Sequence, residues 1–310
     1  MAPDECLNML LAALPNLLTA YWLLATGAVL VVLLPLPIPD AFRAAVRLSA
    51  MRGKLWGNQT AAKGFLQNAS VPQRWFAHFY LLGSVVNAGC VALAVAVARL
   101  PQTTPQPGDT SNLIQAHTWV LLFAFQLHLF RRYVETIGIM HYPAAARMHV
   151  VAYVFALTYY AAAPLSMLPS SAFKLELLQG LLVFLSGNAL QLQSHVLLAR
   201  LATRSKTASK DTKRAAPSSS AKSQHDQEPQ RQYSIPHGGL FSLVSCPHYL
   251  AEIVIYLGLW LISGLQLNQA LMLAWVVSNL VLAAGETQAW YLRRFPDYPE
   301  TRTALLPWLY

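Results

Sequence analysis

Charged side chains are scarce in this chain of 310 residues, of which only 11% are Asp, Glu, Lys or Arg. Soluble domains carry about 25% charged residues. Apolar residues make up 55% of the chain. This balance argues against an ordinary water-soluble fold and indicates that lipid is the main solvent.

The motifs of common soluble enzymes are also missing. There is no G-x-G-x-x-G fingerprint, and Gly53-Lys54 lacks the glycine-rich loop of a P-loop. No H-E-x-x-H or Cys-x-x-Cys pair occurs, so we predict no metal site. No G-x-S-x-G elbow indicates a serine hydrolase. The cysteines Cys6, Cys90 and Cys246 are far apart and form no disulfide framework.

The chain instead contains about seven apolar runs, each near the length of about 20 residues that a helix needs to cross a bilayer. The runs are continuous rather than alternating, which excludes a membrane β-barrel and leaves helices. We therefore predict an all-α integral membrane protein with about seven transmembrane helices. Their approximate ranges are 17–36, 76–98, 113–131, 148–168, 176–199, 248–264 and 267–290.

The basic residues predict an orientation. If the seven helices alternate, 20 of the 22 Lys and Arg residues fall on one side of the membrane, and only Arg99 and Lys174 fall on the other. Cytosolic loops carry this excess of positive charge. We expect a luminal N-terminus and a cytosolic C-terminus. The net charge of +9 then belongs to membrane flanks, and no nucleic-acid partner is predicted.

The predicted helices and loops divide the chain into four segments. Residues 1–74 hold the first helix and a basic cytosolic connector, and residues 75–202 hold helices two to five. Residues 203–234 are largely polar, rich in Ser, Lys, Ala and Gln, and are expected to form a disordered cytosolic linker. Residues 235–310 hold helices six and seven and the tail.

Polar residues recur at helical spacing near the cytosolic ends of four predicted helices. Ionisable groups are costly in a membrane and usually serve binding or chemistry. We therefore expect one shared polar cavity open to the cytosol. The alternative is that each group makes only a structural hydrogen bond or ion pair, with Arg131 and Arg132 as ordinary flanking residues. The stripes are His128, Arg132 and Glu135; Asn188, Gln191 and His195; His248, Glu252 and Tyr256; Asn279, Glu286, Trp290 and Tyr291.

Several strings from about residue 71 onward resemble the membrane steroid 5α-reductase family, and within it the branch that acts on polyprenols or polyprenals. The most specific are the motif Pro247-His248-Tyr249-Leu250-Ala251-Glu252 and the tail Asp297-Tyr298-Pro299 with Arg302 and Ala304-Leu305-Leu306-Pro307. Moderate matches are Val71-Pro72-Gln73-Arg74-Trp75, Leu127-His128 with Arg131-Arg132 and Glu135, Gln191 with His195, and Trp290-Tyr291.

The resemblance implies a multi-pass enzyme of the endoplasmic reticulum membrane that uses NADPH to reduce a carbon–carbon double bond beside a carbonyl. Residues 235–310 would then be the cofactor-binding region. Carried over by position, the cofactor contacts are Gln191, His195, His248, Tyr249, Glu252, Tyr291, Asp297, Tyr298 and Arg302. The 2′-phosphate of NADPH would require arginine, and Arg132, Arg302 and the pair Arg293–Arg294 are available for it.

The chain departs from the family at two positions. His248 stands where members usually carry Asn, and Leu129 stands where steroid-reducing members carry a candidate proton-donating Tyr. The candidates for acid–base catalysis are therefore His78, Tyr80 and His128.

The predicted reaction is reduction of the α-isoprene unit of a polyprenal or polyprenol, to dolichal or dolichol, in the dolichol synthesis that serves N-glycosylation. The partners expected are the isoprenoid lipid and the bilayer, with no obligate protein partner evident. The rival interpretations are a 3-oxo-steroid 5α-reductase or enoyl reductase of the same family, an isoprenylcysteine methyltransferase-like membrane enzyme, and a non-enzymatic lipid transporter. A transporter would be expected to show internal repeats and broken helices, which the sequence lacks.

Overall fold

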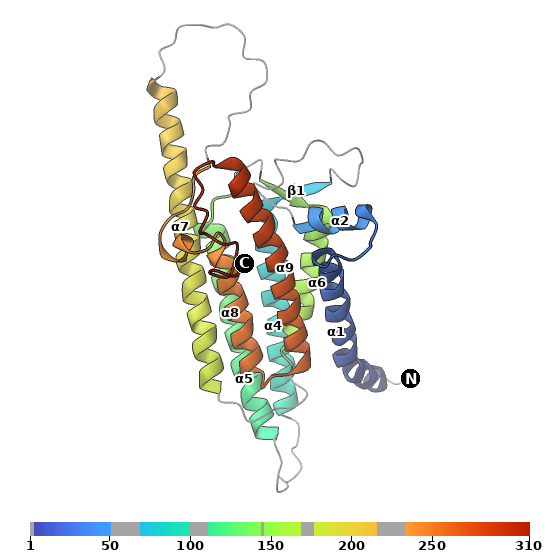
Figure 1. The fold of residues 1–310 in the computed structure, drawn as a ribbon. Coiled ribbons are helices and arrows are strands. Elements are labelled where there is room, and N and C mark those ends of the chain that lie inside the picture. The colour runs from blue at the N-terminus through green and yellow to red at the C-terminus, as the bar shows by residue number, and fades with distance from the viewer. Residues whose placement is uncertain (1–2, 51–68, 100–110, 144–145, 169–176, 216–232) are drawn as a thin grey trace.

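The computed structural model describes residues 3–50, 69–99, 111–143, 146–168, 177–215 and 233–310. These ranges form a bundle of long helices that run roughly parallel to one axis (Figure 1). The main helices are α1 (Pro3–Leu33), α4 (Phe76–Ala98), α5 (Ser111–Val134), α6 (Val150–Ser166), α7 (Leu177–Ala215), α8 (Pro247–Ile262) and α9 (Leu267–Arg294).

Each predicted apolar run coincides with one of these helices. Four helices in the described ranges are long and apolar enough to cross a membrane, over Ala12–Leu33, Gln73–Ala96, Leu177–Thr203 and Leu267–Arg294. Helices α6 and α8 are apolar but shorter. The chain is therefore a mostly helical protein with several membrane-spanning helices, while the count of seven spans and the orientation remain predictions.

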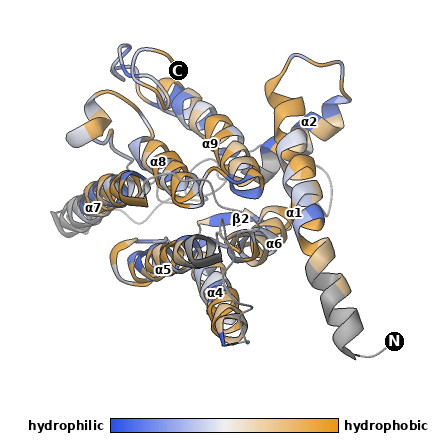
Figure 2. Cartoon of the chain, turned by 90° about the horizontal axis from the view of Figure 1, so that it is seen from below, coloured by the Kyte–Doolittle hydropathy of each residue, from blue (hydrophilic) through white to orange (hydrophobic). Residues whose placement is uncertain are grey.

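The outer faces of the helices are apolar. Leu24 on α1, Phe123 on α5 and Leu178 on α7 are each at least 60% exposed, and Figure 2 shows apolar residues around much of the bundle. Water would penalise such a surface, whereas hydrocarbon would not. The exposed leucines and phenylalanines therefore support a lipid environment for the bundle.

Helices α7 and α8 make the closest contact, because glycines line their interface. A Cβ built on Gly258 would lie 2.5 Å from the backbone nitrogen of Phe184, and one on Gly187 would lie 2.7 Å from that of Ile255. Small residues let the backbones of membrane helices approach closely. This contact fixes the polar face of α7 against that of α8.

An aromatic core holds the other helices together. Trp22 of α1 is fully buried, donates from Nε1 to Ser166 Oγ at 2.9 Å, and meets the edge of Tyr159 of α6 with ring centroids 5.6 Å apart. Trp275 of α9 packs on the same Tyr159 ring at 4.5 Å. Burying large aromatic rings stabilises the junction of α1, α6 and α9.

The basic connector contains structure that the sequence analysis did not predict. The short helix α2 (Asp40–Ala50) has Arg43, whose guanidinium donates to the carbonyls of Val32 and Leu36 and caps the end of α1. Strand β1 (Ser70–Pro72) pairs antiparallel with β2 (Arg147–His149), with Val71 opposite Met148. The 3₁₀ turns η2 (Gln73–Trp75) and η4 (Gly239–Ser242) precede α4 and α8.

The prediction of a disordered linker over 203–234 is wrong at its start, because α7 continues to Ala215. Residues 203–215 are rich in Ala, Lys and Arg, which favour helix once a long apolar helix has nucleated it. Residues 216–232 of the predicted linker lie outside the described residues. The segment 233–238 is described and has no regular structure.

Candidate active site

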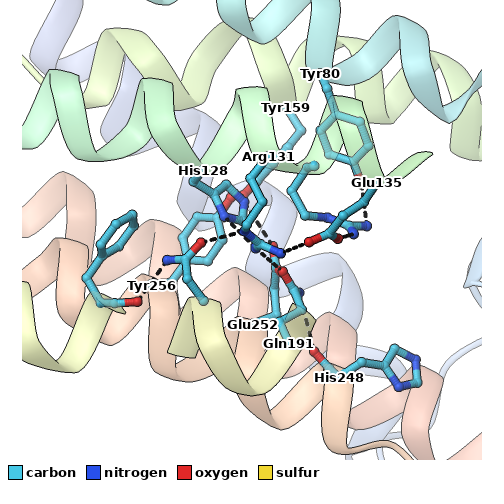
Figure 3. Close-up of polar contacts among 12 residues, drawn as sticks. Tyr80, His128, Arg131, Glu135, Tyr159, Gln191, His248, Glu252 and Tyr256 are labelled. Carbon is cyan, nitrogen blue, oxygen red and sulfur yellow. Dashed lines mark hydrogen bonds and ion pairs between the residues drawn. The ribbon is translucent and has the colours of Figure 1, made fainter. Parts of the chain in front are cut away.

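Two adjacent arginines at the end of α5 form the centre of a buried polar cluster (Figure 3). Arg131 donates to Asn188 Oδ1 at 2.8 Å and to Glu135 and Gln191. Arg132 donates to Glu135 Oε2 at 2.6 Å. Glu135 begins a π-helical turn, η3 (Glu135–Ile139), and this widened turn follows directly on α5.

Arg132 also connects α5 to two further helices. Its Nη2 donates to the Tyr80 hydroxyl of α4 at 2.7 Å, and its guanidinium lies 5.1 Å from the centroid of the same ring. His195 of α7 lies with Nδ1 2.9 Å from Arg132 Nη1 and 2.7 Å from Glu135 Oε2. Guanidinium groups suit this role because they donate in several directions at once.

Helix α8 contributes the second carboxylate of the cluster. Glu252 Oε1 lies 3.6 Å from Nε2 of His128, which is fully buried on α5. Gln191 of α7 donates from its amide to the other oxygen of Glu252 and lies 3.4 Å from the His248 carbonyl oxygen. The path Arg131–Gln191–Glu252–His128 therefore joins α5, α7 and α8 through side chains.

The charges in this cluster balance. Arg131 and Arg132 both pair with Glu135, and Glu252 lies beside His128. Buried ions are tolerated when they are paired and hydrogen-bonded. At the end of α5, burial alone would raise the pKa of Glu135. The hydrogen bond with His195 and the charges of Arg132 and Arg131 instead hold that pKa at about 2. Glu135 is therefore ionised at neutral pH.

Tyrosines close the side of the cluster toward the aromatic core. Tyr159 of α6 donates to the hydroxyl of Tyr256 of α8, and the Tyr256 ring meets the His128 ring at 6.1 Å and nearly at right angles. Both tyrosines are buried. Figure 3 shows Tyr256 on the His128 side of the cluster, away from Glu135. Tyrosine rings therefore border the polar cluster on one side, and the arginine–glutamate pairs border it on the other.

A second group of predicted residues gathers where the tail returns to the bundle. Arg302 is 3% exposed, donates to the Pro236 carbonyl at 3.0 Å, and lies 5.1 Å over the Tyr298 ring. Tyr298 stacks on Tyr291 at 5.0 Å. Backbone bonds from Ser245 and Cys246 to the carbonyls of Thr303 and Ala304 hold the tail beside the start of α8. His248 and Tyr249, whose rings are 4.2 Å apart, are in that same first turn of α8.

The structure thus brings seven of the predicted residues into the first cluster: Tyr80, His128, Arg132, Gln191, His195, His248 and Glu252. Tyr291, Tyr298 and Arg302 form the tail group, and Tyr249 lies beside His248. Asp297 is exposed on the tail.

His78 lies apart from the Arg131–Arg132 cluster. Its Nδ1 is 2.9 Å from the Tyr153 hydroxyl of α6, and its ring contacts Trp75. Residues 78 and 80 are two apart on a helix and therefore project from different faces of α4. The geometry favours Tyr80 and His128 over His78 as groups near a reacting centre.

Two further residues differ from the expectation. Glu286, part of the predicted stripe on α9, lies 3.9 Å from Arg47 of α2 and is not in the contacts of the cluster. Arg131, interpreted as a possible membrane flank, instead joins three other cluster residues. The i, i+4 spacing of Arg131 and Glu135 was the available signal for this pairing.

The polar side chains contact one another directly, and a cleft of about 480 Å³ lies elsewhere in the bundle. This cleft runs between α1, α8 and α9. Its walls are Thr26, Leu30, Leu33, Trp260, Ala270, Leu273, Ala274, Val277, Ser278 and Val281. The expected polar cavity is thus a compact network of paired groups, and this open space is apolar.

Fold and site together define a helical membrane protein with a buried, charge-balanced polar centre beside an ordered C-terminal tail. Residues 135–310 match the family model of 3-oxo-5-alpha-steroid 4-dehydrogenase. The chain belongs to this family.

Curated relatives resemble the chain over most of its length. It is 31% identical to polyprenal reductase 1 of Arabidopsis thaliana, across 93% of this chain and 95% of the relative. It is 27% identical to the polyprenal reductase of Caenorhabditis elegans, across 81% and 84%, and 26% identical to that of Saccharomyces cerevisiae, across 79% and 77%. The similarity to the Arabidopsis protein extends far beyond the family match, which begins only at Glu135.

Proposed function

We propose that this protein reduces the α,β double bond of a polyprenal, with NADPH as hydride donor, in the endoplasmic reticulum membrane. The observation that carries the proposal is the His128–Glu252–Gln191 connection buried among membrane helices, in a chain whose relatives are polyprenal reductases. Polar and ionisable side chains are costly to bury inside a membrane, so the convergence of several at one place supports a functional centre.

The residues fit a reduced dinucleotide. Arg302 has a buried Nε that makes no hydrogen bond within the described part of the chain, and a phosphate oxygen is a suitable acceptor for it. Tyr291 and Tyr298 offer ring faces beside it. Glu252 and Gln191 present an acceptor and an amide that suit a carboxamide group. We assign Arg302, Tyr291 and Tyr298 to the nucleotide end, and Gln191, His195, His248 and Glu252 to the nicotinamide end.

Bound NADPH supplies the hydride, and the protein supplies position and charge. The substrate must be electron-poor at its β-carbon. An aldehyde conjugated to the double bond meets this need, whereas an isolated allylic alcohol does not. The aldehyde oxygen gains negative charge as the hydride arrives. Arg132, considered above for the 2′-phosphate, lies 2.7 Å from the Tyr80 hydroxyl, and we assign these two groups as the donors for that oxygen instead.

A proton must then reach the α-carbon of the enolate. His128 is placed for this step, since its Nε2 makes no hydrogen bond within the described residues and lies 3.6 Å from Glu252. The reaction balances as one hydride on the β-carbon and one proton on the α-carbon, with NADP⁺ released.

The test of the proposed function is turnover of a defined lipid by purified protein. Polyprenal, polyprenol and a 3-oxo-Δ4-steroid are supplied separately with NADPH, and NADPH absorbance and product mass are followed. We expect NADPH consumption and a product with two added hydrogens for the aldehyde alone. Reduction of the steroid with no reduction of polyprenal would contradict the proposal.

Glu252→Gln tests the assignment of the nicotinamide end. Losing the charged acceptor should weaken NADPH binding by about tenfold or more, because hydrogen bonds to charged groups contribute about 1.5–3 kcal/mol. The matched control is Glu286→Gln, which removes a carboxylate that pairs with Arg47 outside the cluster. The measurement is NADPH affinity by titration. Equal affinities in the two variants would show that Glu252 does not contact the cofactor.

A further inference from the structure

The tail that follows α9 has a charged first part and an apolar second part. Residues 293–302 include five charged side chains, whereas residues 303–310 include none. In the second part, Trp308 is 85% exposed and Leu309 is 80% exposed. Large apolar side chains that gather on a surface in this way mark a contact with a protein or a membrane.

The apolar part lies beside the middle of α9 rather than at its end. The Tyr310 hydroxyl donates to the Val281 carbonyl at 3.2 Å, and Leu305 is buried in a cluster with Ala284. Val281 precedes Arg294, the last residue of α9, by about 20 Å at 1.5 Å per residue. Figure 1 shows the C mark part-way down α9, and Figure 2 shows it outside the ring of helices. The tail therefore turns back along the outside of the bundle.

That section of α9 lies at the edge of the membrane. Leu282 is buried against Val29 and Val32, which belong to the last turns of the span Ala12–Leu33 of α1. The amphipathic helix α2 follows directly after the end of that span. Acyl chains therefore give way to headgroups at about this level, and Trp and Tyr are enriched at such boundaries. The turn that carries Trp308 thus lies at the depth that suits its ring.

Backbone contacts fix this turn in a strained shape. Trp308 has a φ of 61°, in the left-handed region that bulky residues rarely adopt. The backbone nitrogens of Leu305 and Leu306 both donate to the main-chain oxygen of Tyr310, at 2.6 and 2.7 Å. Such a conformation persists only where the surrounding structure requires it. The turn holds the Trp308 ring out from the protein rather than burying it.

We propose that the turn Leu306–Tyr310 inserts into the interface of the bilayer, between the acyl chains and the headgroups. The turn continues the apolar outer surface of the bundle and carries no charged side chain for a polar partner to recognise. An indole suits this boundary, because its ring contacts acyl chains while its N–H reaches headgroups or water.

Insertion of the turn also holds the tail group beside it. The Arg302 carbonyl accepts from the Gln288 amide at 2.7 Å, and the Thr303 carbonyl accepts from the backbone nitrogen of Ser245 at 2.8 Å. These contacts are only a few residues from the turn. The bilayer contact therefore keeps Arg302 in place before the cofactor arrives. This consequence rests on the proposed function, in which Arg302 binds the nucleotide end.

Fluorescence quenching in liposomes of the purified protein tests the depth of the turn. In a cysteine-free background, Leu309→Cys carries an environment-sensitive fluorophore, and Glu300→Cys, at an exposed position in the charged part, is the control. One quencher is a phospholipid with a nitroxide near the headgroup end of its acyl chain, and the other is iodide on both sides of the bilayer. We expect the lipid nitroxide to quench the label at 309 at least about twofold more than the label at 300, and iodide to show the reverse order.

Trp308→Asn tests the consequence for the cofactor in a protein with unaltered cysteines. Asn adopts the left-handed backbone more readily than Trp, and the exposed ring has little protein packing to lose. A role within the protein alone therefore predicts no change. We expect NADPH affinity, measured by titration in liposomes, to fall by about threefold, because binding must then order the tail. Glu300→Asn is the control and should keep the wild-type affinity.

Three results would count against these expectations. Equal quenching of the two labels by iodide would overturn the insertion, and so would protection of the label at 309 from both quenchers, as a second copy or another protein would give. Wild-type affinity in Trp308→Asn would overturn the link to Arg302. A wild-type protein that binds no NADPH overturns the proposed function instead, and the quenching still decides the insertion.

Discussion

Glu135 shows how one buried carboxylate links the end of α5 to α7. Its neighbours keep its pKa at about 2, below the ordinary value of 4.5. A carboxyl group with a lowered pKa in the folded state contributes stability above its unfolded pKa. That contribution is lost as the pH falls through the folded pKa. The effect of Glu135 should therefore appear between about pH 4.5 and pH 2.

The prediction is that the wild-type protein loses thermal stability over this acidic range more steeply than a Glu135→Gln variant. The variant has no carboxyl group to protonate, and it should be less stable at neutral pH because Arg131 and Arg132 lose their partner. Thermal unfolding in detergent at several pH values measures both. Parallel pH profiles for the two proteins would show that Glu135 is not the titrating group.

At the residue scale, the sequence identified most residues of the polar cluster but not how they pair. Helical spacing placed His128, Gln191 and Glu252 on inward faces, and the structure brings them together. The sequence could not show that Glu252 belongs to the cluster whereas Glu286 pairs with Arg47 outside it. Both are lone carboxylates in apolar helices, and only the neighbouring helix decides their partners. Arg131 was ambiguous for the same reason, since a flanking arginine and a buried one look alike in sequence.

At the scale of elements, the interface between α7 and α8 decides whether the polar faces meet. The two helices approach through glycines that tolerate no side chain, and Gln191, His195, His248 and Glu252 lie along the same interface. A spread of the two backbones would separate Gln191 from Glu252. Stability and cofactor binding should therefore depend on the same contact.

Gly258→Ala should lower both the thermal stability and the activity of the protein. The added Cβ would lie 2.5 Å from the Phe184 backbone nitrogen, and overpacking of this kind costs about 1–3 kcal/mol. Gly89→Ala is the matched control, because a Cβ at Gly89 meets nothing within 4 Å. Alanine there should be neutral or slightly stabilising. Equal melting temperatures for the two variants would contradict close packing at Gly258.

The main helices were predictable because apolar runs of this length have few alternatives in lipid. The smaller elements were not. Helix α2 is short and amphipathic, and its position depends on contacts such as Arg43 with the end of α1. The pairing of β1 with β2 joins residues distant in sequence, as Val71 with Met148 shows, and three-residue strands leave no usable periodicity.

At the scale of the whole molecule, the orientation of the bundle can be tested at the two ends of α9. The distribution of Lys and Arg predicts that Arg294 faces the cytosol and Leu267 the lumen. In a cysteine-free background, Arg294→Cys should react with a membrane-impermeant maleimide in sealed microsomes with the cytosolic face outside. Leu267→Cys should react only after permeabilisation. The reverse pattern would invert the proposed topology.

The small sheet also has a mechanical consequence for the bundle. Backbone hydrogen bonds between β1 and β2, with Arg147 bonded to Ser70, tie the start of α4 to the start of α6. Helices clipped in this way resist sideways separation at that end. Because α4 and α6 are tied together at this end, a long lipid that enters from the bilayer must pass between other helices of the bundle.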